Sequence, residues 1–171
     1  MTGERTTVLE LTRMEAAHLA GLVTQFEELI QGADDGAPDD PAIARLVPDG
    51  YTDDREAAQE FRGLTQRDLL DRRESDAARV LASLHETPGL PAEGSITDPS
   101  DATLLEVMQL RLDPEDLQAW LRTLAALRLV LASRLGITTE EDHDGDDPRF
   151  GIYDWLGFRL DGLVRAADEM F

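Results

Sequence analysis

Arg128 raises the first chemical question in this sequence. It lies in the middle of LRTLAALRLVLASRLG, residues 121–136, a stretch that is otherwise almost entirely apolar. Arginine keeps its proton at any accessible pH, so an unpaired guanidinium in an apolar interior would cost several kcal/mol. The pattern therefore predicts that another segment brings a carboxylate or a set of carbonyl oxygens to Arg128.

The partner of this arginine is sought among acids on the inner faces of other helices. Asp54 is the first candidate, because it falls on the apolar face of a helix predicted over residues 54–64. Glu60, which borders the same face, is the second, and Asp154 is a weaker third. We favour a structural ion pair that fixes how two helices dock.

Two other interpretations of the arginine stay open. Arg128 could bind an anion in a pocket, together with Arg62 or Arg45 as a second cation. Its long side chain could also reach a nearby surface and keep its charge in water.

No other group of residues predicts catalysis, a cofactor or a metal. The acidic stretch EDHDGDDP (141–148) lacks the glycine and the closing glutamate of a calcium loop, because Asp147 and Tyr153 occupy those positions. The sequence contains neither a GxSxG elbow nor a GxGxxG or GKS/GKT phosphate loop. It has no cysteine, which excludes disulfides, thiolate nucleophiles and zinc–thiolate sites. We expect no catalytic residue, no cofactor and no metal ligand.

The charge of the chain limits its partners. Asp and Glu number 36 against 16 basic residues, all of them arginine, for a formal net charge of -20. Such a field repels nucleic acid and acidic lipid, so neither direct nucleic-acid binding nor membrane binding is expected. With no spanning apolar run and no signal-peptide pattern, a cytoplasmic protein is the simplest interpretation. The acidity favours a protein partner with a basic surface.

The elements that would hold these residues are mostly helices. The pattern predicts a strand over about 6–11, helices over about 13–31, 54–64 and 65–85, and a long central helix over about 114–135. Thr12 with Glu15 predicts a capping box, Asp40 and Asp113 are expected to be N-caps, and Gly136 is expected to end the central helix. Residues 106–112 alternate like a strand that pairs with 6–11, although a helix starting at Ser100 stays open. Loops over about 32–40, 86–103 and 138–149 are expected to be mobile. The fold class is mainly α: a single domain, residues 1–171, formed by a helical bundle around the central helix.

The last predicted helix, from residue 150 to the end, is apolar over most of its circumference. Tyr153, Trp155, Leu156 and Phe158 mark it as a core helix or an interaction helix. Burial within the monomer is favoured over a dimer seam, because a single-domain core needs a closing helix. The expected state is a monomer or a weak homodimer.

Three stretches together resemble a known family. They are DDPAIARLVPDGYTDDREAAQEFRGLTQRDLLDRR (39–73), LDPEDLQAWLRTLAALRLVLASRLGI (112–137) and IYDWLGFRLDGLV (152–164). They resemble the actinobacterial AosR-like family, a domain of unknown function often encoded beside the ClpS protease adaptor. The sequence departs from the family pattern at Ala125 and Ala126, where an Asn-Asp pair is usual, and at Arg159, where an apolar residue is expected.

The resemblance implies a small helical protein with a regulatory role. Such a protein would respond to stress and act through partners in the transcription machinery. A redox-sensing version of that role requires cysteines, which this chain lacks. We therefore expect a non-enzymatic regulatory or interaction module. The alternative from another class is a small-molecule or anion-binding protein, with or without enzymatic activity, that uses its buried arginines.

Overall fold

The chain forms a mainly helical fold with one small sheet. The computed structural model describes residues 3, 5–33, 40–47 and 55–170, with the backbone alone for residues 55–64. In chain order the elements are β1 (Thr7–Thr12), α1 (Arg13–Ala33), α2 (Pro41–Leu46), α3 (Arg55–Glu86), the 3-10 helix η1 (Ala102–Leu105), β2 (Val107–Leu112), α4 (Pro114–Leu135), the 3-10 helices η2 (Glu140–Asp142) and η3 (Pro148–Phe150), and α5 (Gly151–Met170). The predicted fold class is confirmed.

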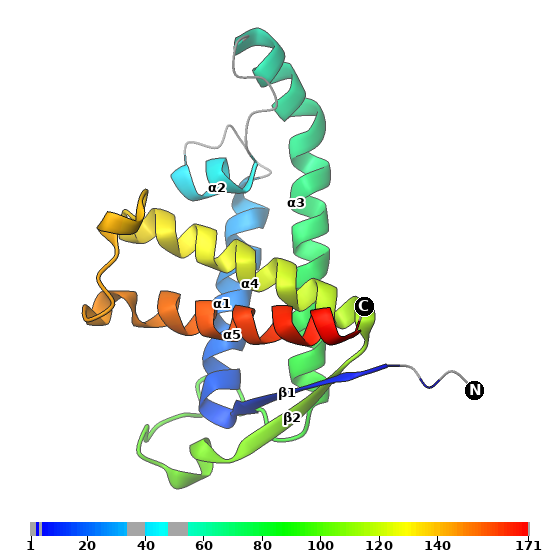
Figure 1. Cartoon of the computed structure of the whole chain (residues 1–171), viewed down its shortest axis with the longest axis vertical. Coiled ribbons are helices and arrows are strands. Elements are labelled where there is room, and N and C mark those ends of the chain that lie inside the picture. Colours follow the sequence, from blue (N-terminus) through cyan, green and yellow to red (C-terminus); the bar gives the residue numbers. More distant parts are fainter. Residues whose placement is uncertain (1–2, 4, 34–39, 48–54, 171) are drawn as a thin grey trace.

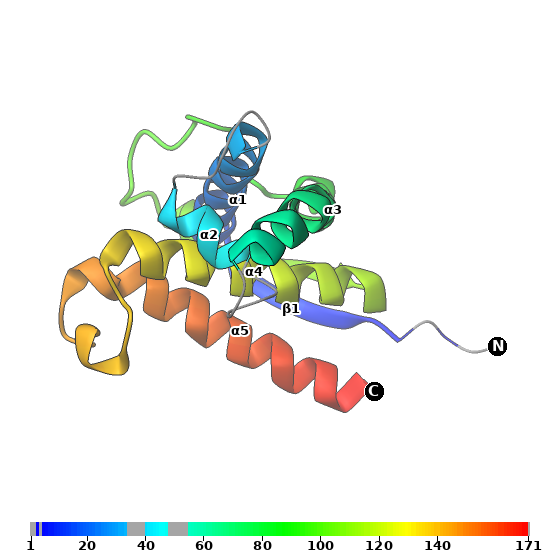
Figure 2. The same ribbon diagram turned by 90° about the horizontal axis from the view of Figure 1, so that it is seen from above.

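The long helices form two antiparallel pairs that cross. Figure 1 shows α1 and α3 running side by side in opposite directions, with α4 and α5 lying across them. The view from above shows α4 between the α1–α3 pair and α5 (Figure 2). Helix α4 contacts α1, α2, α3, α5 and β2. It is the central helix, as the breadth of its apolar face predicts.

The inner side of α4 contributes several large side chains to the core. Leu117, Trp120 and Leu124 are fully buried there, each exposed by 1% or less. Burial of one such side chain stabilises the fold by about 1.5–3 kcal/mol. The Trp120 indole nitrogen donates to the hydroxyl of Ser83 on α3 at 2.9 Å, so the one polar atom of the ring is satisfied.

The two strands pair antiparallel, with Thr7 opposite Leu112 and Thr12 opposite Val107. Met108, Leu110 and Leu112 alternate with exposed residues and point into the core. The strand interpretation of residues 106–112 is therefore correct. Helical structure in this region is limited to the short 3-10 helix η1, which ends before β2 begins.

Helix ends follow the local capping chemistry. Thr12 and Glu15 form the predicted capping box: the Glu15 amide donates to the Thr12 hydroxyl, and the Thr12 amide donates to the Glu15 carboxylate. Asp113 caps α4 through the Asp116 amide at 2.7 Å. Gly136 ends α4 with φ of 73°, a left-handed conformation that glycine adopts at low cost.

One boundary differs from the sequence-based expectation. Residues 55–86 form a single helix, α3, where two helices with a new start at Thr65 were predicted. No proline lies between residues 55 and 86, and the lone Gly63 costs a helix only about 1 kcal/mol. A capping pattern inside a helix-forming stretch is therefore not enough to end the helix before it.

Candidate functional site

Arg128 lies between α4 and α5. Its guanidinium carbon is 4.2 Å from the centre of the Tyr153 ring, a cation–π contact. A Cβ added at Gly157 would lie 3.0 Å from that carbon, 3.1 Å from Nη2 and 3.3 Å from Nε. Because the carbon is the nearest of the three atoms, the guanidinium presents its flat face to Gly157. The side chain is half-buried and helps to dock α5 onto α4.

The predicted carboxylate partner of this arginine is not among the described side chains. Within that part of the chain, no Asp or Glu lies within ion-pair distance of Arg128, and its buried Nε has no acceptor. Asp54 lies outside the described residues, and the structure does not describe the side chain of Glu60. Pairing with either acid stays a prediction. Asp154, the weaker candidate, instead accepts a hydrogen bond at 2.6 Å from His143.

The other two candidate arginines do not join Arg128 in a shared cluster of described atoms. Arg45 donates to the backbone carbonyl of Ile137 at 2.8 Å and so ties α2 to the end of α4. The side chain of Arg62 lies outside the described part of the molecule.

The four candidate residues of α5 divide between core and surface. Leu156 is fully buried, and Tyr153 and Trp155 are half-buried. Phe158 is 70% exposed. Helix α5 therefore closes the core through one side, as expected, and leaves apolar side chains on its outer side.

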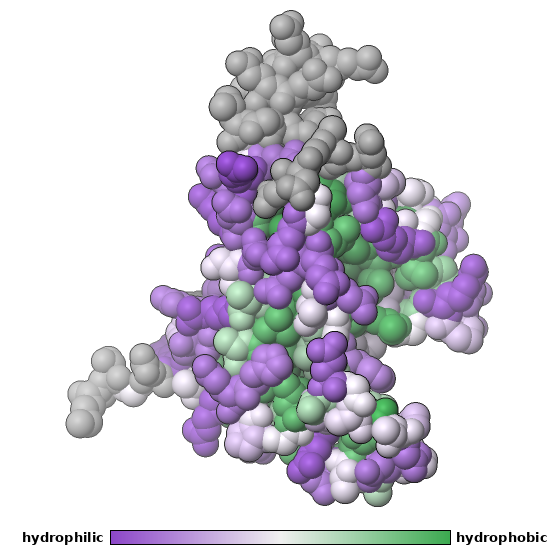
Figure 3. All heavy atoms as spheres, turned by 180° about the vertical axis from the view of Figure 1, so that it is seen from behind, coloured by the Kyte–Doolittle hydropathy of each residue, from purple (hydrophilic) through white to green (hydrophobic). Residues whose placement is uncertain are grey.

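An open groove with a mainly apolar lining runs between α1 and the start of α5 and has a volume of about 710 Å³. We call it the α1–α5 groove; its lining residues are Thr12, Met14, Glu15, Ala17, His18, Gly21, Leu22, Gln25, Leu105, Gly151, Ile152 and Trp155. Leu105 and Ile152 are 67% and 53% exposed at its edge. Figure 3 shows that apolar side chains also reach the surface among polar ones on the face opposite to that of Figure 1.

The groove was not predicted from the sequence. The available signal was the pair of small residues Ala17 and Gly21 on the side of α1 that faces away from the core residues Leu19 and Val23. Small residues on one side of a helix do not show which other segments pack beside that helix, so the groove could not be predicted from them.

One carboxylate holds the walls of the groove together. Glu15 on α1 accepts hydrogen bonds from the Trp155 indole at 2.9 Å, from Arg159 at 2.7 Å and from the Thr12 amide at 2.8 Å. Burial raises the pKa of the Glu15 carboxyl, but the bonds from Arg159, Thr12 and Trp155 together outweigh burial and leave that pKa below its ordinary value. Arg159, an unexpected cation in the sequence, is thus the partner of a half-buried acid.

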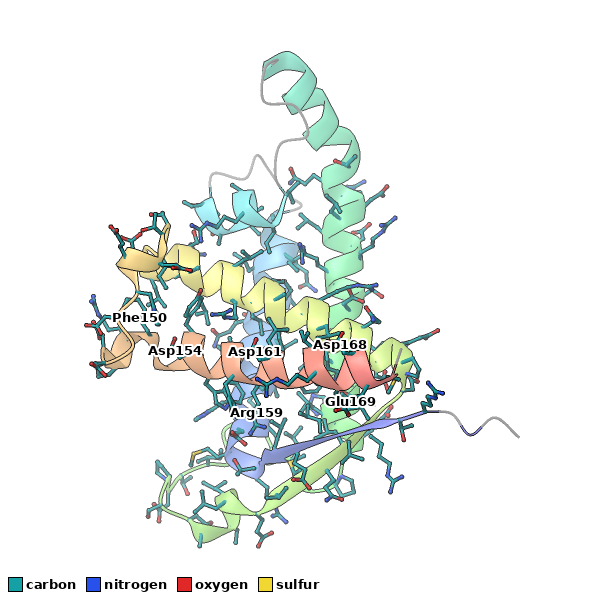
Figure 4. The ribbon with its side chains drawn as sticks, in the orientation of Figure 1. Phe150, Asp154, Arg159, Asp161, Asp168 and Glu169 are labelled. Atoms are coloured by element: carbon teal, nitrogen blue, oxygen red, sulfur yellow. The ribbon has the colours of Figure 1, made fainter. Side chains whose placement is uncertain are left out.

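Three acidic side chains follow one edge of α5. Figure 4 shows Asp154, Asp161 and Asp168 following one another along the helix, with Arg159 directed to the other side. Asp161 and Asp168 are exposed, and neither forms an ion pair with a described side chain. An acidic edge, in which only Asp154 has a bonded partner among the described side chains, therefore runs along α5 on the side away from Arg159 and the groove.

Other kinds of site find no support in the described part of the chain. No three His, Asp or Glu side chains there are gathered as a metal site would require. None of the helices in the described ranges combines the length and apolarity needed to cross a bilayer.

Comparison with known proteins gives one match. A family described as "Domain of unknown function (DUF2017)" matches residues 1–167. No curated protein and no solved structure matches the chain.

Proposed function

The chain belongs to the DUF2017 family, and we propose that it acts as a non-enzymatic interaction module whose α1–α5 groove receives apolar side chains of a basic protein segment. The observation that carries this proposal is the groove itself. It is open and mainly apolar, and Thr12, Trp155 and Arg159 beside it are already bonded to Glu15.

The groove suits a helix or an extended segment with one apolar side. Its walls come from α1, α5 and the turn η1, and the Glu15 bonds join α1 to α5 before any partner arrives. A partner therefore does not have to order these walls, which lowers the entropic cost of association. Each apolar side chain that it buries contributes about 1.5–3 kcal/mol before that cost is subtracted.

Charge supports a basic partner over a second copy of this chain. The net charge of -20 opposes self-association, because two copies repel each other. Asp161 and Asp168 lie on the edge of α5 away from Arg159 and the groove, so a basic partner is favoured by the excess of negative charge over the whole chain. A segment with apolar residues on one side and Lys or Arg elsewhere complements both the groove and this charge.

The resemblance to the AosR-like family supports a narrower assignment within this proposal. It implies a cytoplasmic regulator that acts through the transcription machinery, whose proteins commonly carry basic surfaces. Because the chain has no cysteine, the regulation we propose does not use a thiol switch.

The test compares two variants of α5 that carry the same change in charge. Ile152→Glu places a carboxylate in the groove, whereas Val164→Glu places one on the same helix outside it, and both native residues are exposed. Tagged wild type and both variants are used to recover proteins from a native lysate. The affinity of the main recovered protein is then measured with purified components.

We expect Ile152→Glu to weaken that affinity about tenfold or more, and Val164→Glu to leave it nearly unchanged. Ile152→Glu should fold normally, since an acid in the first turn of a helix is favourable. Equal affinities for all three proteins would contradict the groove as the binding site. A groove-dependent association of the chain with itself, seen by sedimentation, would replace the basic partner with a second copy.

A further inference from the structure

A second cavity lies at the same end of α5 as the α1–α5 groove but on the side that meets α4, and the two share no lining residue. It has a volume of about 650 Å³ and is bounded by the end of α4, the turn η2 and the start of α5. Its chemically active lining residues are Arg128, Glu140, His143, Tyr153 and Asp154. The interaction proposal uses none of them as a binding group.

The cavity holds a guanidinium that has no acceptor among the described residues. The Nε atom of Arg128 is buried and makes no hydrogen bond. The two terminal nitrogens of Arg128 also make no hydrogen bond to the described part of the chain, but unlike Nε they are not fully buried. The contacts with Tyr153 and Gly157 fix the plane of the group without using its donors. A ligand oxygen that reaches this cation therefore replaces no existing bond to a described residue.

The lining of the cavity also includes two acidic side chains, Glu140 and Asp154. Glu140 is exposed and forms no ion pair with a described side chain. Asp154 accepts from His143 at 2.6 Å and is still 39% exposed, so part of its carboxylate faces water. The same cavity thus contains a fixed cation and two carboxylates that form no ion pair with it and that attract positive charge.

The wall that carries Glu140 is ordered by a single carboxylate. Asp142 accepts from the amides of Thr138 and Thr139 at 2.9 Å and 3.0 Å, and from the Thr138 hydroxyl at 2.7 Å. These bonds fix the turn that follows α4. They also consume the donors of that turn, so the turn itself offers little to a bound anion.

This arrangement selects among ligands by charge. A multiply charged anion such as phosphate would gain from Arg128 but would be repelled by Glu140 and Asp154. A simple amine would be attracted by Glu140 and Asp154 but repelled by Arg128. A molecule with a carboxylate at one end and an ammonium group at the other is favoured at both ends.

From this geometry we infer that the cavity binds a small zwitterionic carboxylate, of which free α-amino acids are the simplest class. The carboxylate lies on the donors of Arg128, and the ammonium group faces Glu140 and Asp154. Tyr153 also lines the cavity, and its hydroxyl makes no hydrogen bond to a described residue. The site is separate from the groove and does not depend on the proposed interaction function.

The test is a calorimetric titration of the full chain near neutral pH. The probes are L-alanine, L-leucine and L-glutamine as zwitterions, with acetate and inorganic phosphate as anions that lack an ammonium group. We expect at least one amino acid to bind with a Kd of about 1 mM or below, and both anions to bind about tenfold more weakly or not at all.

Matched variants locate the binding. Arg128→Met and Glu140→Gln should each weaken binding of the amino acid, the first by about tenfold or more. Arg149→Met removes an equal charge from an exposed arginine that pairs with Asp147 outside the cavity, and it should have no effect. If Arg128→Met does not fold, Glu140→Gln still tests the site, because Glu140 is exposed.

Three results would overturn the inference. One is the absence of saturable amino-acid binding to the wild type up to about 10 mM. Another is phosphate or acetate that binds as tightly as the amino acids. The last is an equal loss of binding in Arg149→Met. None of these results bears on the α1–α5 groove, whose test uses Ile152 and Val164.

Discussion

Gly157→Ala gives the sharpest test of how Arg128 is held. In the interior of an exposed helix this change stabilises a protein by about 1 kcal/mol, because alanine is the better helix former. In this chain the new methyl group would lie 3.0 Å from the guanidinium carbon of Arg128. Ordinary carbon contacts are about 3.5–4.0 Å, so the guanidinium has to move.

The cost of that movement follows from the contact it breaks. Lifting the guanidinium weakens its stacking on Tyr153, which lies 4.2 Å away and is worth about 0.5–2 kcal/mol for a cation–π pair. The gain and the loss nearly cancel, so Gly157→Ala should change the wild-type stability by less than about 1 kcal/mol. In an Arg128→Ala background nothing has to move, and the same change should stabilise by about 1 kcal/mol.

Urea unfolding of the four proteins in this cycle measures the coupling. Midpoints and slopes are followed by tryptophan fluorescence and by circular dichroism, and equal slopes show that stability alone has changed. We expect a coupling free energy of about 0.5–2 kcal/mol between the two positions. Equal stabilisation by Gly157→Ala in both backgrounds would refute the packing of the guanidinium on Gly157.

Three further predictions concern the core and the turn after α4. Leu156→Ala should destabilise the protein by about 2–5 kcal/mol in urea unfolding, because Leu156 is fully buried on the inner side of α5. Ser83→Ala should cost about 1 kcal/mol in the same assay, since it leaves the buried Trp120 nitrogen without its acceptor, and should cost less in a Trp120→Phe background. The hydroxyl of Thr138, its amide and the Thr139 amide lower the pKa of Asp142 from 3.8 to about 2. The stabilisation is therefore present above pH 3.8 and is lost as the pH falls through about 2, so the Thr138 amide resonance should titrate near that lower value and not near 3.8.

Local sequence signals predicted the helix ends well. The capping box of Thr12 and Glu15, the caps Asp40 and Asp113 and the terminating Gly136 act within a few residues, and each appears as expected. The central position of α4 was also predictable, because a helix that is apolar on most sides has to be covered on most sides.

The surroundings of Arg128 were not predictable in the same way. The sequence showed that a cation lies within an apolar face, but not which helix would cover it. In the structure that helix is α5, which offers the ring of Tyr153 and the open space of Gly157. A ring and a glycine carry no charge, so a search for acidic partners passes over them.

The groove was missed because its parts are distant in the sequence. Met14 and Gly21 on α1, Leu105 on η1 and Ile152 on α5 come together only through tertiary packing. Taken singly, each is an ordinary exposed or half-exposed residue of its own element.

The partner is expected to bind in the α1–α5 groove. Hydrogen exchange of the purified chain, measured alone and in complex with its recovered partner, tests this expectation most directly. We expect slower exchange in the complex over residues 12–25 and 151–155, the segments of β1, α1 and α5 that line the groove. Protection confined to other segments, with these two unchanged at saturating partner, would contradict the proposed site.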